Sequence, residues 1–161
     1  MAVRMELSRI FIREMSDMQI IELTEIGGDR TFPIVIGLNE AFAIERRLKS
    51  IEPPRPQTHE LLASVIEHLG GQLKEIIIND LSDRTFFAKL IIEQDGVEIE
   101  VDSRPSDAIA LGVAQNAPIY VAEHVLEQTS ADNGAAELGL GGEFELDEDE
   151  IDDEDEGEEW T

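Results

Sequence analysis

The spacing of apolar positions predicts that the chain begins with three strands. Apolar side chains recur at about every second position in "MELSRIFIRE", "MQIIELTE" and "TFPIVIG", which is the period of a strand with one buried face. Gly27, Gly28 and Asp29 separate the second segment from the third, and such residues favour a tight turn. The second and third segments are therefore expected to form a hairpin.

Two helices are expected next. Asn39 is suited to cap the segment "EAFAIERRLKS", whose basic residues fall in the last turns, where the helix dipole favours them. The segment "EPPRPQ" cannot be helical inside. Thr58 is expected to cap a second helix that ends at Gly70. This helix carries one apolar stripe at helical spacing, made of Leu61, Leu62, Val65, Ile66 and Leu69.

Strands then return. "KEIIIND", "TFFAKLIIE" and "VEIEVD" have strand patterns, and Asp95–Gly96 predicts a tight hairpin between the last two. A helix to about Gln115, the short strand "APIYVA" and the short helix "EHVLEQ" complete the order. This order predicts an α+β fold over residues 1–128, a compact single domain with a mixed, mostly antiparallel sheet packed by about three helices.

The C-terminal residues 129–161 are Gly-rich and then almost purely acidic, so we expect a disordered tail. The chain has a net charge of −25, and 15 of its 37 acidic residues lie after residue 131, where there is no Lys or Arg. The first 131 residues keep 22 acidic against 12 basic residues, a net charge of −10. Three roles remain open for the tail: solubility, adaptation to high salt, or self-inhibition as a polyanion.

Composition excludes several classes of site. The chain has no Cys, so disulfides, thiol chemistry and a Cys-bearing zinc site are excluded. "HELLA" resembles the zinc-protease motif, but Ala63 stands where the second His is required. No signal-peptide core and no apolar run of about 18 residues is present. We therefore interpret the chain as a cytoplasmic protein without a membrane segment.

The segment "DSRPSD" is the densest polar cluster before a helix. Pro105 suits the first turn, Asp102 or Ser103 can cap it, and Asp107 favours its dipole. Arg104 is the exception, because a cation near the positive end of a helix is unfavourable. We therefore expect Arg104 to pair with a carboxylate or to bind an anion. A structural cap and a functional site both remain open.

Two further helix starts carry candidate residues. His59 would lie in the first turn of its helix and be neutral near pH 7, which suits a general base or a metal ligand. Arg55, on the rigid segment before it, is a candidate phosphate ligand. Glu40 opens the preceding helix. Together with Asp102 and Asp107 it forms a candidate set for Mg²⁺ or Mn²⁺, although each residue alone is as well explained by helix-end structure.

These same segments resemble the bifunctional nuclease (DNase/RNase) domain proteins of bacteria and plants. The matching pieces occur in the family's order over about residues 3–128: "FPIVIGLNEAFAI", "RPQTHELL", "INDLSDRTFFAKLII", "VDSRPSDAIALGV" and "APIYVAEHVLE". The resemblance implies a compact α+β fold, often oligomeric, and cleavage of DNA and RNA. It carries catalytic roles onto His59, Asp102, Arg104 and Asp107, and substrate binding onto Arg55 and Arg104.

We therefore expect a nuclease that acts on DNA or RNA, assisted by Mg²⁺ or Mn²⁺ held by Asp102, Asp107 and Glu40, with no organic cofactor. A homo-oligomer is also expected. Phosphate binding would require local positive charge, which a patch of Arg46, Arg47, Lys49 and Arg55 around one helix end could supply. The alternatives are a non-catalytic module that binds an anionic ligand or a partner protein, and a hydrolase of small phosphate esters.

Overall fold

The computed structural model describes residues 1–137, in which seven strands form one mixed sheet. Their order across the sheet is β3-β2-β1-β7-β4-β5-β6. The pair β4–β7 is parallel, and the other pairs within this part of the chain are antiparallel. This confirms the expected α+β fold. The strands are β1 Ala2–Phe11, β2 Met18–Glu25, β3 Thr31–Gly37, β4 Gly71–Ser82, β5 Thr85–Gln94, β6 Val97–Ser103 and β7 Ile119–Ala122.

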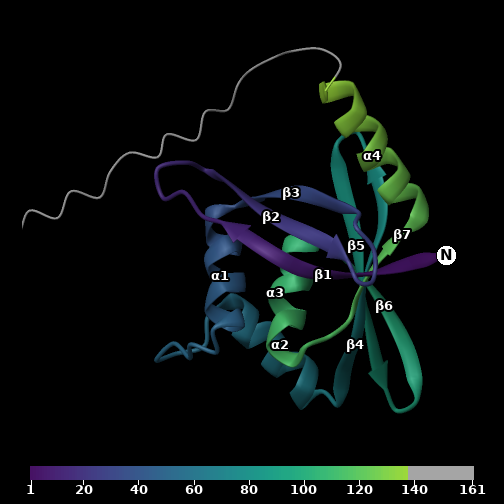
Figure 1. Ribbon diagram of the computed structural model, residues 1–161. Helices are drawn as coiled ribbons and strands as arrows, with labels where there is room; N and C mark the ends of the chain where they lie inside the picture. The colour runs from purple at the N-terminus through teal and green to yellow at the C-terminus, as the bar shows by residue number, and fades with distance from the viewer. Residues whose placement is uncertain (138–161) are drawn as a thin grey trace, which may run out of the picture.

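Four α-helices occur within residues 1–137, rather than about three. They are α1 Leu38–Leu48, α2 Thr58–His68, α3 Pro105–Gly112 and α4 Glu123–Glu137, and the 3-10 turn η1 Val113–Gln115 follows α3. Figure 1 shows α1, α2 and α3 gathered on one side of the molecule, with α4 standing apart at the upper right. None of these helices is long and apolar enough to cross a membrane.

The C-terminal helix is longer than its sequence pattern predicted. The segment "EHVLEQ" begins α4, but the helix continues to Glu137 and so passes the expected domain boundary at residue 128. Val125 and Leu126, in the first turns of α4, are buried in the core. The division of the chain at that boundary stays a prediction. The acidic segment expected to be disordered lies mainly in residues 138–161, outside the described residues.

Helix α3 lies at the centre of the core. Seven of its eight residues are buried, and the exception is Asp107. The helix packs against β4 and β5 on one side and against α1 and α2 on the other. A segment enclosed in this way has to be apolar all round, which explains the run of small and aliphatic residues after Asp107. Packing on all sides holds the N-terminal end of α3 in place, and the polar residues at that end are held with it.

The first two helices begin slightly earlier than predicted. Gly37 is the N-cap of α1, so Asn39 lies inside the first turn and the prediction that it caps the helix was wrong. Gln57 is the N-cap of α2, and Thr58 is its first helical residue. Neither N-cap makes a side-chain capping hydrogen bond. The first-turn N–H groups of both helices therefore receive no hydrogen bond from an N-cap side chain.

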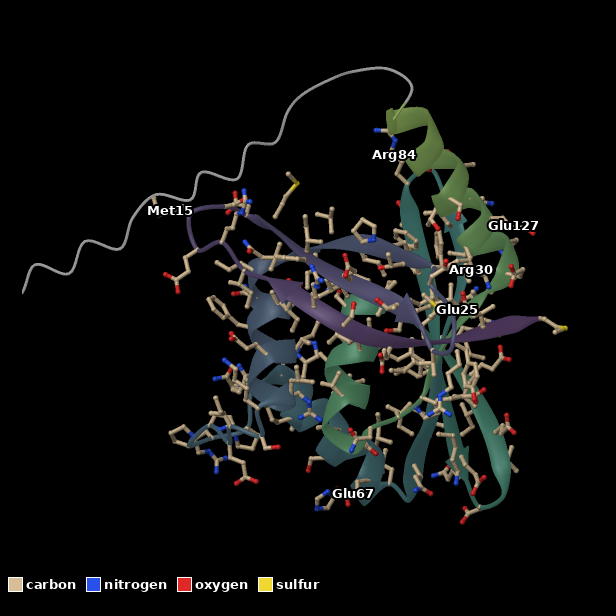
Figure 2. All side chains as sticks on the ribbon, viewed as in Figure 1. Met15, Glu25, Arg30, Glu67, Arg84 and Glu127 are labelled. Atoms are coloured by element: carbon tan, nitrogen blue, oxygen red, sulfur yellow. The ribbon has the colours of Figure 1, made fainter. Side chains whose placement is uncertain are left out.

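An ion-pair network connects the N-terminal hairpin to the last helix. Arg30 donates from Nε to the Glu25 carboxylate over 2.7 Å and from Nη1 to Glu123 over 2.6 Å. Figure 2 shows Glu25 and Arg30 together near the start of α4. The paired carboxylates raise the pKa of Arg30, and the Arg30 hydrogen bond lowers the pKa of Glu25. The network connects β2, the turn after it and α4.

Candidate active site

Four polar side chains from three helix starts form one connected chain. Arg104 immediately precedes α3 and donates from Nε to Asp107 Oδ2 over 2.8 Å. Its Nη2 donates to Glu40 Oε1, in the first turn of α1, over 3.0 Å. Asp107 Oδ1 lies 2.9 Å from His59 Nε2, in the first turn of α2. The loops that the sequence could not place relative to one another therefore meet.

Arg104 is held in place by charge. Its hydrogen bond to Asp107 raises its pKa, burial opposes this, and the hydrogen bond to Glu40 adds to the rise. This is the carboxylate pairing expected for a cation at the positive end of a helix. The side chain is still 64% exposed, and within the described part of the chain Nη1 has no hydrogen-bond partner, because Asp107 and Glu40 accept from Nε and Nη2. Arg104 therefore has a fixed orientation and a free donor.

Asp107 orients the imidazole of His59. Burial raises the pKa of Asp107, but the hydrogen bonds and positive charges of Arg104 and His59 outweigh it, so the pKa lies below its usual value. An ionised carboxylate accepts the proton of Nε2, which leaves Nδ1 as the ring nitrogen that can accept a proton. The His59 side chain is only 13% exposed. This is the arrangement of an oriented general base.

Local sequence explains why these groups can approach one another. Pro105 is the first residue of α3, where its missing N–H costs little and its fixed φ favours helix. Arg104 is consequently extended, with φ −71° and ψ 145°. Gly37 has no side chain, and a Cβ at that position would clash with the Glu40 carboxylate. The Gly before α1 thus lets Glu40 fold back toward Arg104.

The chain of polar groups borders a cleft of about 1040 Å³. Helices α1, α2 and α3 and strands β5 and β6 contribute to its walls. One part is polar, around Glu40, His59, Arg104 and Asp107, and the rest is mainly apolar. The apolar part is formed by Phe42, Ala43, Leu62, Ile66, Leu90, Ile92, Val101 and Leu111. A cleft of this kind can hold an organic ligand that carries a polar or charged group at one end.

The remaining two expected site residues lie apart from the polar chain. Asp102 is exposed on β6 opposite Lys89 in register, and it borders the cleft. Among the described residues its side chain makes no hydrogen bond or ion pair. Arg55 is exposed on the segment before α2, and it is not among the residues that line the cleft. The structure therefore brings four of the six expected residues together, with Asp102 at the edge and Arg55 outside.

The expected metal ligands do not form a ligand set as they are arranged. Within residues 1–132, no group of three or more His, Asp or Glu side chains is placed to hold a metal ion. Arg104 bridges Glu40 and Asp107, and both oxygens of Asp107 already accept hydrogen bonds. A cation between these carboxylates would have to displace the guanidinium. The geometry thus supports the His59–Asp107 pair more directly than a metal centre.

The basic patch considered from the sequence is not a free anion-binding surface, because three of its four cations are engaged. Arg46 binds the Glu60 carboxylate with two nitrogens. Arg47 donates to the carbonyl oxygens of Ala110 and Leu111 at the end of α3, and Lys49 pairs with Glu45. Arg55 is the one cation of the four without a partner in the described part of the chain.

The Arg46–Glu60 pair at the cleft was not predicted from the sequence. Arg46 lines the cleft, Nε lies 2.9 Å from Glu60 Oε1, and both side chains are less than 20% exposed. Burial raises the pKa of Glu60, but the hydrogen bond from Arg46, a backbone hydrogen bond and the positive charges of Arg46 and Arg47 together outweigh it, so the pKa is lowered. The signal was present in the sequence, because Glu60 directly follows His59 and so lies in the same first turn of α2.

The chain matches the family model of the bifunctional nuclease domain over residues 21–134. It belongs to the bifunctional nuclease domain family. The matched region contains all the elements from β3 to β7 and every residue of the polar chain. The resemblance on which the sequence analysis relied is thereby confirmed.

Relatives within this group differ in how much is known of them. The uncharacterised proteins MT1877 and Rv1829 of Mycobacterium tuberculosis are each 43% identical over 119 residues, which cover 74% of this chain and 71% of theirs. Bifunctional nuclease 1 of Oryza sativa is 26% identical over 105 residues, covering 63% of this chain and 32% of the rice protein. The rice protein is therefore similar to this chain over about a third of its own length.

Proposed function

We propose that this protein is a nuclease that hydrolyses phosphodiester bonds of DNA or RNA in the cleft beside the His59–Asp107 pair. The observation that carries the proposal is the connected chain of Glu40, Arg104, Asp107 and His59 at the border of a ligand-sized cleft. Membership of the bifunctional nuclease domain family and similarity to a rice bifunctional nuclease support it.

The proposed chemistry assigns one role to each group. Asp107 keeps the Nε2 proton of His59 in place, and Nδ1 takes a proton from the water whose oxygen attacks phosphorus. The P–O bond to the sugar oxygen breaks, and this leaving oxygen takes up a proton from the His59 imidazolium or from solvent. Arg104 stabilises the negative charge that develops on the phosphate through its remaining donor. Glu40 holds Arg104 from the other side. Asp102 and Arg55, which lie farther out, would contact substrate rather than the reacting atoms.

Metal dependence is left to experiment. Mg²⁺ or Mn²⁺ would supply positive charge to a cleft lined by three carboxylates and two guanidinium groups: Glu40, Asp102, Asp107, Arg46 and Arg104. Asp102 is the carboxylate that a cation can reach without displacing Arg104. No step of the proposed reaction depends on the ion, because the three expected ligands are not arranged as a set. A cytoplasmic location and assembly into a homo-oligomer also stay predictions.

A non-catalytic binding module is the second candidate. The observation that favours it is that two carboxylates already balance the charge of Arg104. A partly neutralised cation in an acidic protein attracts a polyanion weakly. In that case the same cleft would bind a small anionic ligand or a partner protein without turnover. A hydrolase of small phosphate esters would instead turn over small substrates and leave polymers intact.

The test is cleavage of labelled single-stranded and duplex DNA and RNA, with Mg²⁺, with Mn²⁺ and with chelator. His59→Ala should lower the cleavage rate by roughly 10²–10⁴-fold, the usual contribution of a general base. His124→Ala is the matched control, because His124 also lies near a carboxylate, Asp80, but outside the cleft. Absence of cleavage by the wild type, or equal loss in both variants, would reject the proposal.

A further inference from the structure

A second pocket adjoins the cleft at Arg104. It has a volume of about 370 Å³ and lies where the end of β3, the β4–β5 turn and the start of α3 meet. Of the described residues, Arg104 alone lines both this pocket and the cleft. We call it the Arg84 pocket, after the arginine of the β4–β5 turn that also lines it. The proposed chemistry makes no use of this pocket.

Two helices begin at the Arg84 pocket. Gly37, the N-cap of α1, and Arg104, the N-cap of α3, both line it. Neither helix receives a side-chain hydrogen bond from its N-cap. The N–H groups of a first turn and the helix dipole together favour an anion. The acidic residues of these first turns, Glu40 and Asp107, line the cleft and not this pocket.

A buried hydroxyl without a partner lines the same pocket. Ser106 is only 6% exposed, and its side chain makes no hydrogen bond within the described part of the chain. Among the described residues, Asn79 Oδ1 is the one side-chain polar atom that is fully enclosed without a partner. The Ser106 hydroxyl therefore keeps contact with the pocket. Buried hydroxyls are normally hydrogen-bonded, so this donor is available to an occupant of the pocket.

Arg84 brings an unpaired cation to the pocket. It forms no ion pair in the described residues, and Figure 2 shows it at the β4–β5 turn, near the top of the view. Arg84 and Asp83 both have positive φ, at 62° and 50°, and turns of this kind favour Asn or Gly. The turn therefore gives no local reason for an arginine. Thr85, the next residue, adds a second hydroxyl to the lining of the pocket.

The balance of charge in the pocket favours an anion. Arg84 and Arg104 are opposed by one carboxylate in the lining, that of the exposed Asp17. Arg104 is also bound by Glu40 and Asp107, so Arg84 is the cation with the most charge to offer. The two helix ends add to the positive side.

The rest of the lining suits a phosphate group of modest surroundings. Ile34 and Ile36 form a buried apolar wall, and apolar surroundings strengthen the attraction between charges. Guanidinium groups and hydroxyls are the donors that phosphate oxygens accept from most readily. A pocket of about 370 Å³ lies at the lower end of the range for ligand pockets. It therefore suits a phosphate with its sugar rather than a larger ligand.

We propose that the Arg84 pocket binds a phosphate group, held by Arg84, the hydroxyls of Thr85 and Ser106 and the start of α3. Such a group could come from a free nucleotide or from the backbone of a nucleic acid. Because Arg104 lines both the pocket and the cleft, the phosphate is assigned to the backbone, next to the one that reacts. This assignment to the backbone rests on the proposed nuclease function, whereas phosphate binding in the pocket does not.

Titration of the full chain with inorganic phosphate, followed by amide NMR at constant ionic strength, tests the site. The signals of Thr85, Ser106 and Asp107 should shift and saturate at about 1–10 mM phosphate. Arg84→Asn, which keeps a residue suited to positive φ, should weaken binding at least about tenfold, and Ser106→Ala by a smaller factor. Arg4→Ala is the matched control, because Arg4 is exposed, has no ion pair in the described residues and lines neither the pocket nor the cleft.

Two outcomes of the titration would overturn the site. One is a wild type whose signals show no saturable shift at about 10 mM phosphate. The other is equal phosphate affinity in the wild type and in Arg84→Asn. The amide spectrum of each variant without phosphate checks that the fold is retained.

Cleavage of a trinucleotide and of a dinucleotide identifies the source of the phosphate. The wild type should cut the trinucleotide with a kcat/KM at least about tenfold higher, because only this substrate has a second phosphate for the pocket. Arg84→Asn should bring this ratio close to equality by raising KM for the trinucleotide, and Arg4→Ala should preserve it. The same ratio in the wild type and in Arg84→Asn overturns the assignment to the backbone. If the wild type cuts neither substrate, the proposed nuclease function fails, and phosphate binding that depends on Arg84 then assigns the pocket to a free nucleotide.

Discussion

At the scale of single residues, Arg104 and Asp107 determine the geometry of the site. Arg104 binds carboxylates from two different helices, and Asp107 divides its two oxygens between Arg104 and His59. Removal of Arg104 leaves Glu40 without its partner, and removal of Asp107 leaves Arg104 with Glu40 alone and His59 without its acceptor. These two residues therefore contribute to stability as well as to the proposed chemistry.

The lowered pKa of Asp107 makes stability depend on pH. A carboxylate whose pKa is lower in the folded than in the unfolded chain stabilises the fold above its unfolded pKa, near 4, and this stabilisation is lost as the pH falls through the folded value. Asp107→Asn should lower the free energy of unfolding by roughly 1–3 kcal/mol at neutral pH and flatten its acid-side decrease.

Urea unfolding over a pH series measures this effect. The matched control is Asp29→Asn, which changes an exposed aspartate in a turn and should leave the pH profile unchanged. If the profile of Asp107→Asn runs parallel to that of the wild type at every pH, the ion pairs of Asp107 contribute nothing to folding.

At the scale of secondary-structure elements, much of the fold followed from local pattern. Local apolar patterns predicted the seven strands, and Asp95–Gly96 predicted the β5–β6 hairpin, where both residues have positive φ. The pairing of Arg104 with carboxylates followed from its unfavourable position at a helix start. These features depend on neighbours in sequence, which is why sequence alone could predict them.

Features that depend on distant contacts could not be predicted. The convergence of Glu40, His59 and Asp107 requires the relative positions of three helices, which no local pattern contains. For the same reason, the sequence could not show that Arg47 is unavailable to a basic patch, because it donates hydrogen bonds to carbonyl oxygens at the end of α3. The sequence also could not show that most apolar residues of the α2 stripe remain exposed, because helices that pack their stripe on a core have the same spacing.

Close packing of α3 on β4 gives a prediction at this scale. Gly→Ala usually stabilises a helix by up to about 1 kcal/mol, but a Cβ on Gly112 would clash with Ile76 and lie 3.3 Å from Ala117 Cβ. Gly112→Ala should therefore destabilise the fold by roughly 1–3 kcal/mol.

Ile76→Val removes the methyl group that the new Cβ would meet. In a double-mutant cycle followed by urea unfolding, Gly112→Ala should cost much less in the Ile76→Val background than in the wild type. If the changes in the free energy of unfolding of the two single variants simply add in the double variant, contact with Ile76 is not the reason that a larger residue is unfavourable at position 112.

At the scale of the whole molecule, the distribution of charge sets the behaviour toward nucleic acid. The first 131 residues already carry a net charge of −10, and residues 138–161 add 13 acidic residues and no basic ones. Arg46, Arg47 and Lys49 already bind carboxylates or carbonyl oxygens. Few unpaired cations therefore remain to which the acidic C-terminal segment could bind. Its effect on a polyanion should then be repulsion at a distance rather than occupation of a patch.

Deletion of residues 138–161 tests this interpretation and leaves α4 intact. Affinity for single-stranded nucleic acid should rise at low salt, and the difference from the full chain should shrink as salt screens the charge. Fluorescence anisotropy over a salt series measures both. Equal affinities at every salt concentration would favour the solubility or salt-adaptation roles.

The most direct test of the central claim is a double-mutant cycle of cleavage rates across the His59–Asp107 pair. If the two side chains act as one catalytic unit, His59→Ala and Asp107→Asn should each lower the rate, and the double variant should lose little more than the worse single variant. If the rate loss of the double variant equals the product of the two single losses, the two side chains act separately. Unchanged rates in a folded double variant would contradict the assignment of the site.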